Sequence, residues 1–429
     1  MNDMPATAPR AALLLFGAGD FAFNLYWQAV NLYLLFFYID TLRLAPALAG
    51  TLFLIGAAWD GAADFAAGVV AERMRRPYRW LIGWGALPLG LAFVAMFAAP
   101  AGAWPWALVA QLGFRTLYAF TNIPYAAWTT RLAGTSAERS LLAGLRMIFG
   151  AVAATFVAGI FPQLVQVMGG YAAASALLAL LGVPLLLAIA LRVPERRPPP
   201  TIAVAPRIGP ALALLARNRA FVALNLAAAA GAAAAALTTQ SVLYFFRYVL
   251  ADDPAGPRAL AAMAFASLIA TPLWTIAARR AGARAAWLAA CGLALALPAA
   301  FVLLPAPGVA AATLFLLCMQ VAFAGFGLAA WTLLPDCVDW GAARTGVRVE
   351  AIAFGAFALA QKAALAAAGF AIGAIYQASG FVAGAPQTAT SLAAIRWLML
   401  AGPALLLLAA LAAILALPLR KNTLADLAT

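Results

Sequence analysis

Twelve apolar stretches, each long enough to cross a lipid bilayer as a helix, constrain this chain more than any other feature of its sequence. Such a crossing takes about 20 mostly apolar residues. Of the 429 residues, 66% are hydrophobic and only 10% are charged, whereas soluble domains carry about 25% charged residues. The sequence therefore predicts an all-α polytopic membrane protein with helices over residues 11–38, 47–70, 78–99, 104–130, 141–168, 172–192, 220–249, 257–278, 284–304, 309–334, 350–378 and 392–418.

A basic, proline-rich segment separates the sixth apolar stretch from the seventh. Its composition is typical of an exposed linker, and we expect a cytoplasmic linker over residues 193–219. Residues 1–192 and 220–429 would then form two six-helix bundles. The turns over residues 68–80 and 276–287 support an internal repeat, because both are arginine-rich and end in tryptophan. Two pseudo-symmetric bundles of this kind are typical of transporters with a substrate site between the repeats.

The basic residues are distributed asymmetrically between the two predicted sides of the membrane. With both termini in the cytoplasm, 20 of the 27 lysines and arginines lie on the cytoplasmic side, 4 on the outer side and 3 inside the membrane. Cytoplasmic loops of membrane proteins carry such an excess. The asymmetry supports cytoplasmic termini, and it explains the net charge of +13 without a nucleic-acid partner.

The residue types also bear on catalysis. The chain contains no histidine, and its three cysteines have no ligand-like spacing, so neither a nucleophile–base set nor a metal site is visible. A sensor would usually carry a soluble output domain, and none is evident. We therefore expect a transporter rather than an enzyme or a sensor, with no cofactor.

Two acids interrupt the second apolar stretch. Asp60 and Asp64 are four residues apart, so both lie on one face of a helix. A charge at this depth costs about 2.5–3.5 kcal/mol or more, and two neighbouring carboxylates need a bound cation or a proton. We therefore expect a cation- or proton-coupling site there, with Na⁺ as one candidate ion. Lys362 is a candidate counter-charge, whereas Arg115 either snorkels to the membrane surface or pairs within its bundle.

The first apolar stretch carries a polar stripe formed by Asp20, Asn24, Gln28 and Asn31. Such a stripe does not face lipid, so we expect it to face a water-filled cavity that binds substrate. The Asp20 carboxylate would accept hydrogen bonds from hydroxyl groups, and a guanidinium would donate to a substrate oxygen or hold that carboxylate. Aromatic rings would provide flat surfaces for a sugar ring. The candidate substrate-binding residues are Asp20, Asn24, Trp27, Tyr118, Asn122, Arg146 and Trp331.

Several strings together resemble the glycoside–pentoside–hexuronide:cation symporters, the melibiose permease group of the major facilitator superfamily. Residues 17–24 are similar to the family's first-helix opening, residues 59–64 to its W-D-x-x-N-D signature, and residues 336–350 to its loop before the eleventh helix. Asn122 to Tyr125 with Glu138, Arg139 and Arg146, and Gln361 with Lys362, match further family positions. The resemblance implies the major facilitator fold and a bacterial inner (plasma) membrane protein that works as a monomer.

Departures from the family pattern affect the implied ion and substrate. Ala63 stands where the signature has asparagine, Phe65 replaces a proline, and Ala119 replaces a hydroxyl found in some Na⁺-coupled members. The loss of oxygen ligands favours H⁺ over Na⁺. Asn122 and Ala126 replace an acid and an aromatic of the galactoside permease, so another sugar or glycoside is expected, and a lysolipid-like amphiphile stays an alternative.

The resemblance also implies transport by alternating access. Arginine-rich turns would form cytoplasmic ion pairs with nearby acids and so hold the inner gate in one state. The candidate gating residues are Arg73, Glu138, Arg139, Asp336, Asp339, Arg348 and Glu350.

Overall fold

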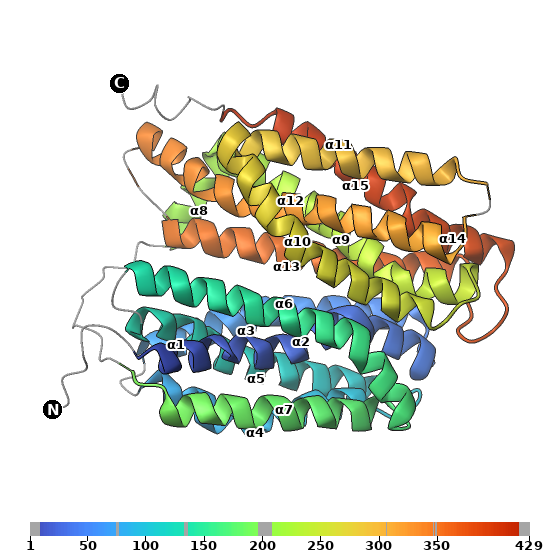
Figure 1. Cartoon of the computed structure of the whole chain (residues 1–429), viewed down its shortest axis with the longest axis horizontal. Helices are drawn as coiled ribbons and strands as arrows, with labels where there is room; N and C mark the ends of the chain where they lie inside the picture. The colour runs from blue at the N-terminus through green and yellow to red at the C-terminus, as the bar shows by residue number, and fades with distance from the viewer. Residues whose placement is uncertain are drawn as a thin grey trace. The chain divides into compact units, whose positions relative to one another are not determined.

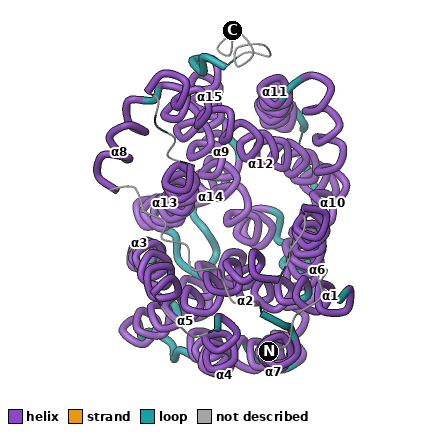
Figure 2. Tube along the Cα trace, turned by 90° about the vertical axis from the view of Figure 1, so that its left-hand side faces the viewer, coloured by secondary structure: helices purple, strands orange, loops and turns teal. Residues whose placement is uncertain are grey.

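The computed structural model describes residues 9–73, 77–132, 136–195, 208–305, 307–345, 347 and 350–419. Over these residues the chain forms helices joined by short turns, without a strand (Figures 1 and 2). The chain divides into two compact units, Met1–Ile202 and Ala203–Thr429.

The first unit begins with a helical segment that changes geometry twice. A break at Ala18 separates α1 from α2, and the segment ends in the π-helical turn η1. The elements of this unit are α1 (Arg10–Gly17), α2 (Gly19–Phe36), η1 (Phe37–Thr41), α3 (Pro46–Arg73), α4 (Tyr78–Phe97), α5 (Trp104–Leu132), α6 (Ser136–Val167) and α7 (Tyr171–Arg192).

The second unit begins with a short helix that the sequence analysis did not predict. This helix, α8, lies within the predicted linker of residues 193–219, whose limits stay a prediction. The elements of this unit are α8 (Ile208–Arg217), α9 (Arg219–Tyr244), η2 (Phe245–Val249), α10 (Ala255–Ala281), α11 (Ala283–Val302), α12 (Val309–Thr345), α13 (Glu350–Ala378), α14 (Ala389–Met399) and α15 (Ala401–Leu415).

Each of the twelve predicted spans corresponds to a helical segment, but one of them is much longer than expected. The helix α12 continues to Thr345 instead of ending near residue 334. The segment 336–341, expected in a loop, is therefore helical, which is a correction to the sequence analysis. The helix also includes Pro335, although proline in a helix interior removes one backbone hydrogen bond.

The same local structure recurs in both units at corresponding positions. The turn η1 is followed by Arg43 with a φ of 58°, and η2 is followed by Ala251 with a φ of 55°. The amide of Leu42 donates to the Phe37 carbonyl, as that of Leu250 does to the Phe245 carbonyl. Every pair is 208 residues apart, so the weak repeat in the sequence reflects a repeat of structure.

Helix packing repeats as well. In the first unit α2 packs against α6 and α7, α3 against α5, and α4 against α5 and α7. In the second unit α9 packs against α13 and α15, α10 against α12, and α11 against α12 and α15. Since these partners correspond one to one in chain order, both units are built on one plan.

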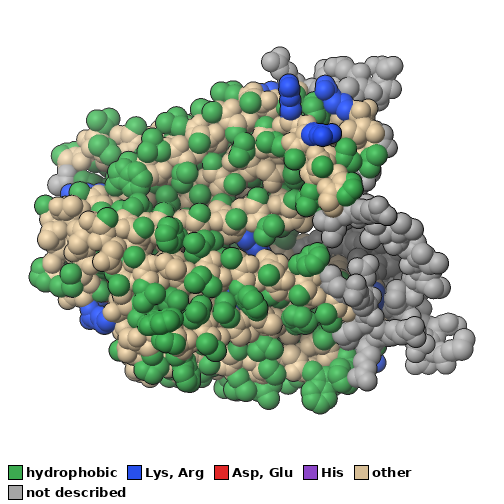
Figure 3. Space-filling view, turned by 180° about the vertical axis from the view of Figure 1, so that it is seen from behind, with side chains coloured by type: hydrophobic (Ala, Val, Ile, Leu, Met, Phe, Trp, Pro, Cys, Tyr) green, Lys and Arg blue, Asp and Glu red, His purple; other side chains and the backbone are tan. Residues whose placement is uncertain are grey.

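The outer surface of the helices is suited to lipid. On α4 the side chains of Trp84, Leu87 and Leu91 are 69%, 56% and 61% exposed, and their spacing places them on one helix face. Figure 3 shows apolar side chains spread over the visible face, with basic side chains mainly near the ends of the helices. Ten helical segments in the described part of the chain are long and apolar enough to cross a membrane. The protein is an integral membrane protein.

Close helix contacts depend on glycines at particular positions, and Gly325 on α12 is one of them. A Cβ atom there would lie 2.7 Å from the Trp274 ring and 2.8 Å from the Cβ of Ala290. The absence of that atom lets the Trp274 indole on α10 donate to the carbonyl of Val321 at 2.8 Å. Gly327, two residues further on, has no such neighbour within 4 Å.

We predict that Gly325→Ala destabilises the protein, because overpacking a tight contact costs about 1–3 kcal/mol. The matched variant Gly327→Ala should leave stability unchanged or raise it slightly, since alanine is the better helix former. Thermal unfolding of the purified protein in detergent measures both. Equal unfolding temperatures for the two variants would contradict this account of the α10–α12 contact.

Candidate functional site

A carboxylate–guanidinium pair joins α2 to α6 in the first unit. The Nε of Arg146 lies 2.5 Å from Oδ2 of Asp20, and its Nη2 lies 3.4 Å from Oδ1. One edge of the guanidinium, formed by Nε and Nη2, thus faces both carboxylate oxygens, an arrangement that gives strong, directional hydrogen bonds. The two side chains keep some exposure, 14% for Asp20 and 25% for Arg146, so they remain accessible.

Helix α5 completes this pair with two hydroxyl groups. The hydroxyl of Tyr125 lies 2.8 Å from Oδ2 of Asp20 and 2.5 Å from the Phe16 carbonyl, and its single proton serves one of them at a time. The Thr129 hydroxyl accepts from Nη1 of Arg146 at 3.2 Å. Each partner of the ion pair is therefore oriented by a residue from a third helix. Tyr125 and Thr129 were not among the predicted site residues.

The pair borders a hollow of about 510 Å³ between α2 and α6. Its polar lining includes the predicted stripe, because Asn24 donates to the Asp20 carbonyl and Gln28 lies near Asn24. Gly150 leaves room for the Asn24 amide, whose Nδ2 would lie 3.1 Å from an added Cβ. The residues around the hollow are Asp20, Asn24, Gln28, Arg146, Met147, Gly150, Ala151 and Ala154. Its volume is within the range of small-molecule sites.

The predicted aromatic and amide residues have different surroundings. The rings of Trp27 and Tyr118 stack with centroids 5.5 Å apart, and Asn122 is half-buried on α5. Trp331 belongs to the second unit, where it is exposed and packs against Phe354 and Phe357. The structure thus places three predicted substrate residues (Asp20, Asn24 and Arg146) around one hollow.

The second intramembrane acid site contains Arg115, whose role the sequence analysis left undecided between snorkelling and pairing. Nη1 of Arg115 on α5 lies 3.6 Å from Oδ1 of Asp60 on α3, and the two side chains are 3% and 2% exposed. Arg115 therefore pairs within its bundle and does not snorkel. Asp64 is half-buried one turn further along α3 and acts electrostatically on Arg115. Lys362 lies on α13 of the second unit, and its role as a counter-charge stays a prediction.

An apolar cluster follows this pair along α3 and α5. Ala63 and Ala67 pack with Ala119, and Phe120 and Ile123 cover them. The two alanines that depart from the family pattern, Ala63 and Ala119, thus belong to the same cluster. No group of three or more acids or cysteines suited to a metal ion occurs among the described residues.

Among the predicted gating residues, the structure describes the side chains of Asp336 and Asp339. Both are half-buried near the end of α12, three residues apart. The side chains of the remaining five lie outside the described residues: Arg73, Glu138, Arg139, Arg348 and Glu350.

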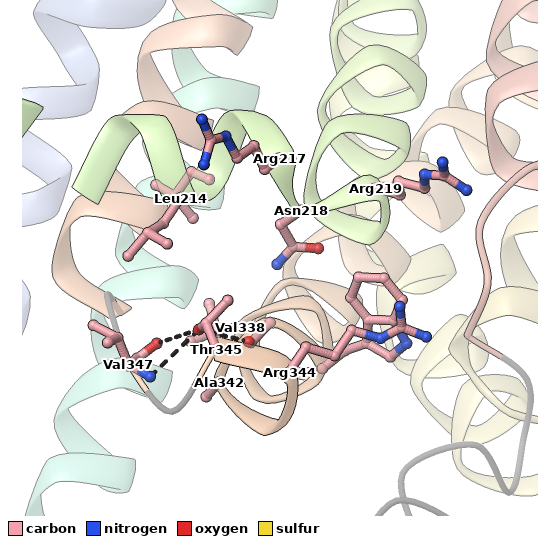
Figure 4. Close-up of a pocket in the computed structure, with 12 residues that line it drawn as sticks. Leu214, Arg217, Asn218, Arg219, Val338, Ala342, Arg344, Thr345 and Val347 are labelled. Atoms are coloured by element: carbon pink, nitrogen blue, oxygen red, sulfur yellow. Dashed lines mark hydrogen bonds between the residues drawn. The ribbon is translucent and has the colours of Figure 1, made fainter. Parts of the chain in front are cut away.

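A pocket of about 380 Å³ lies where α8 and α9 meet the end of α12 (Figure 4). Asn218 caps α9 by accepting from the Phe221 amide at 3.1 Å, and its side chain donates to the Cys337 carbonyl at 2.8 Å. The guanidinium of Arg344 stacks over the Trp340 ring at 4.1 Å. These contacts tie the α8–α9 junction to the helix that carries the predicted gate acids.

Glu195 is a charged residue at the end of the first unit that sequence reasoning missed. It forms a 2.8 Å ion pair with Arg131 and accepts from the amides of Tyr78 and Arg79. It therefore caps the start of α4, where a carboxylate is favourable. The sequence analysis assigned this residue to the exposed linker of residues 193–219, which concealed its role.

Comparisons with known proteins agree with this structure. A family profile described as "MFS/sugar transport protein" matches residues 15–421. The isoprimeverose transporter of Lactiplantibacillus pentosus is 27% identical, with 91% of this chain and 87% of that protein covered. The putative glycoside/cation symporter YagG of Escherichia coli (strain K12) is also 27% identical, with 83% and 80% covered.

Among solved structures, a bacterial homologue of the human lysosomal transporter Spinster, in an inward-facing and occupied conformation, has a TM-score of 0.67. It is 17% identical and 95% of each chain is covered, so this likeness shows the fold alone. The family profile, in contrast, spans nearly the whole chain, and the predicted family is confirmed. The chain belongs to the glycoside–pentoside–hexuronide:cation symporter family of the major facilitator superfamily, and it is a membrane transporter, not an enzyme.

Proposed function

We propose that this protein is a secondary active symporter that moves a sugar or glycoside across the bacterial inner membrane. Both termini would lie in the cytoplasm, and the two units would alternate access to the substrate. The relatives named as an isoprimeverose transporter and a glycoside/cation symporter support this substrate class and coupling to a cation.

One observation carries the proposal: the hollow between α2 and α6 is bordered by a partly exposed carboxylate, Asp20, and a partly exposed guanidinium, Arg146. An ionised carboxylate offers only acceptors and a guanidinium only donors, so the pair can bind both the hydroxyl hydrogens and the oxygens of a sugar. The amides of Asn24 and Gln28 add both functions. Because acyl chains offer no hydrogen bonds, this lining favours a sugar over a lysolipid.

The coupling ion would act at Asp60 and Asp64 on α3. A proton needs a single carboxylate, whereas a metal cation such as Na⁺ is held by several oxygens. The apolar cluster around Ala63 and Ala119 offers no side-chain oxygen, which supports H⁺ over Na⁺. Lys362 would supply a counter-charge from the second unit during part of the cycle.

The predicted inner gate would consist of ion pairs between the arginine-rich turns and acids such as Asp336 and Asp339. Both acids lie beside the segment that Asn218 ties to α8 and α9. A movement of α12 relative to this junction would therefore change the surroundings of the gate acids.

Gradient-driven uptake tests the proposed function directly. Proteoliposomes should accumulate at least one pentoside, hexuronide or other glycoside when an inward H⁺ gradient is imposed. A panel of radiolabelled sugars and one lysophospholipid, with H⁺ and Na⁺ gradients imposed separately, measures this. Accumulation of the lysolipid alone would replace the sugar with an amphiphile as substrate.

We predict that Asp20→Asn weakens substrate binding by about 10- to 150-fold. The variant loses charge-assisted hydrogen bonds worth about 1.5–3 kcal/mol. Equilibrium binding to the purified protein measures the loss. Thr155→Val serves as the control, because the Thr155 hydroxyl on α6 donates to the Ala151 carbonyl of its own helix. Unchanged affinity in Asp20→Asn would place the substrate elsewhere.

Asp64→Asn should separate coupling from binding. We expect the variant to lose uphill accumulation, because no proton or cation can be carried by the amide, while downhill exchange of substrate continues. Counterflow in proteoliposomes measures the exchange, and uptake under an H⁺ gradient measures the accumulation. Uphill transport at the wild-type level would exclude Asp64 from the coupling step.

A further inference from the structure

The ion pair of Arg115 and Asp60 differs from the pair beside the hollow. Its two side chains are almost completely buried, at 3% and 2% exposed, whereas Asp20 and Arg146 retain 14% and 25%. Removal of one partner from a buried ion pair is strongly destabilising. The guanidinium of Arg115 is therefore a fixed part of this acid site, although the proposed transport steps do not use it.

The surroundings of Arg115 hold its guanidinium in place. The rings of Trp27 and Phe53 lie 5.9 and 6.0 Å from its central carbon, within the range of cation–π contacts. Gly56, one turn before Asp60 on α3, has no side chain where a Cβ would collide with the Gln111 amide and lie 3.0 Å from Nε of Arg115. The helix α3 therefore leaves space for these two long side chains of α5.

Gln111 is in turn fixed by the first helical segment. The Tyr38 hydroxyl in η1 lies 3.1 Å from Oε1 of Gln111 and 3.3 Å from the carbonyl of Ala107. Both Gln111 and Tyr38 are completely buried. Residues from α2 and α3 thus lie against the guanidinium, and Tyr38 of η1 fixes its neighbour Gln111, so Arg115 has little freedom to leave Asp60.

Arg115 brings a fixed positive charge to a site with two carboxylates, Asp60 and Asp64, and it forms its ion pair with Asp60. We propose that Arg115 is a tethered cation that occupies the Asp60 half of the coupling site and thereby excludes Na⁺ and Li⁺. The inference rests on the proposed coupling role of the two acids, and it assigns the mobile charge, a proton, to Asp64.

Two features make the arginine a determinant of ion selectivity. A bound alkali cation would need the Asp60 carboxylate as a ligand, but Arg115 already neutralises it. The apolar cluster of Ala63, Ala67 and Ala119 lies on the next turns and supplies no replacement side-chain oxygen. Protonation of Asp64, in contrast, needs no further ligands. The groups that act electrostatically near Asp64 include Arg115 and Tyr118 from α5, with Asp60 on its own helix.

Thermal unfolding of the purified full-length protein tests this role without a transport assay. At about pH 8.5, where protons compete least, the wild-type unfolding temperature should be the same in NaCl, LiCl and choline chloride. Arg115→Gln leaves the Asp60 carboxylate without this counter-charge, so Na⁺ or Li⁺ should raise its unfolding temperature by about 2–4 °C. The matched double variant Asp60→Asn/Arg115→Gln lacks both charges and should not respond to either ion.

Arg115→Lys keeps the positive charge and should remain insensitive to Na⁺ and Li⁺. A variant Arg115→Gln that folds and shows no ion response would overturn the inference. A second measurement needs no arginine variant: stabilisation of the wild type by Na⁺ or Li⁺ that disappears in Asp60→Asn would also overturn it.

These results are independent of the proposed function. A protein that takes up no sugar could still show the ion response in Arg115→Gln, and the tethered cation would then stand while the substrate assignment failed. Sugar uptake driven by a Na⁺ gradient in the wild type would have the opposite meaning. It would support the proposed sugar symport and contradict the exclusion of Na⁺ by Arg115.

Discussion

Compensation of charge inside an apolar helix bundle is the constraint on which the first unit depends. Each of two intramembrane acids, Asp20 and Asp60, lies against an arginine from a different helix. A carboxylate in such surroundings is costly unless a counter-charge and hydrogen bonds accompany it. The two pairs therefore link α2 to α6 and α3 to α5, so the chemistry of the site also holds its helices in register.

The two pairs share chemistry but differ in access. Asp20 and Arg146 border a hollow and keep part of their surface exposed, so they can exchange partners with a substrate. Asp60 and Arg115 are enclosed by packed side chains. Burial thus separates a pair suited to recognition from a pair suited to fixing the charge of a site. Small residues make this difference, because Gly150 opens space beside Asn24 while Gly56 admits Gln111.

The two units share backbone geometry and helix packing, but their charged residues differ. Their π-helical turns lie 208 residues apart, and their helix contacts correspond in chain order. The ion pairs Asp20–Arg146 and Asp60–Arg115 nevertheless belong to the first unit, whereas the predicted counter-charge Lys362 lies on α13 of the second. Repetition of backbone geometry requires only similar packing, whereas charged groups persist where a function needs them.

Hydrophobicity and helical periodicity are local properties, so the membrane class, the twelve helical segments and the acids that interrupt them could all be predicted from the sequence. Which base pairs with which acid depends on packing between helices and became visible only in the three-dimensional structure. Arg115 was ambiguous in the sequence, since snorkelling and pairing use the same side chain, and Tyr125 and Thr129 carried no signal of their contact with the Asp20 pair. Likewise the sequence did not show that α12 continues past Pro335 to Thr345. Spacing along one helix fixes a face, but only packing between helices fixes a partner.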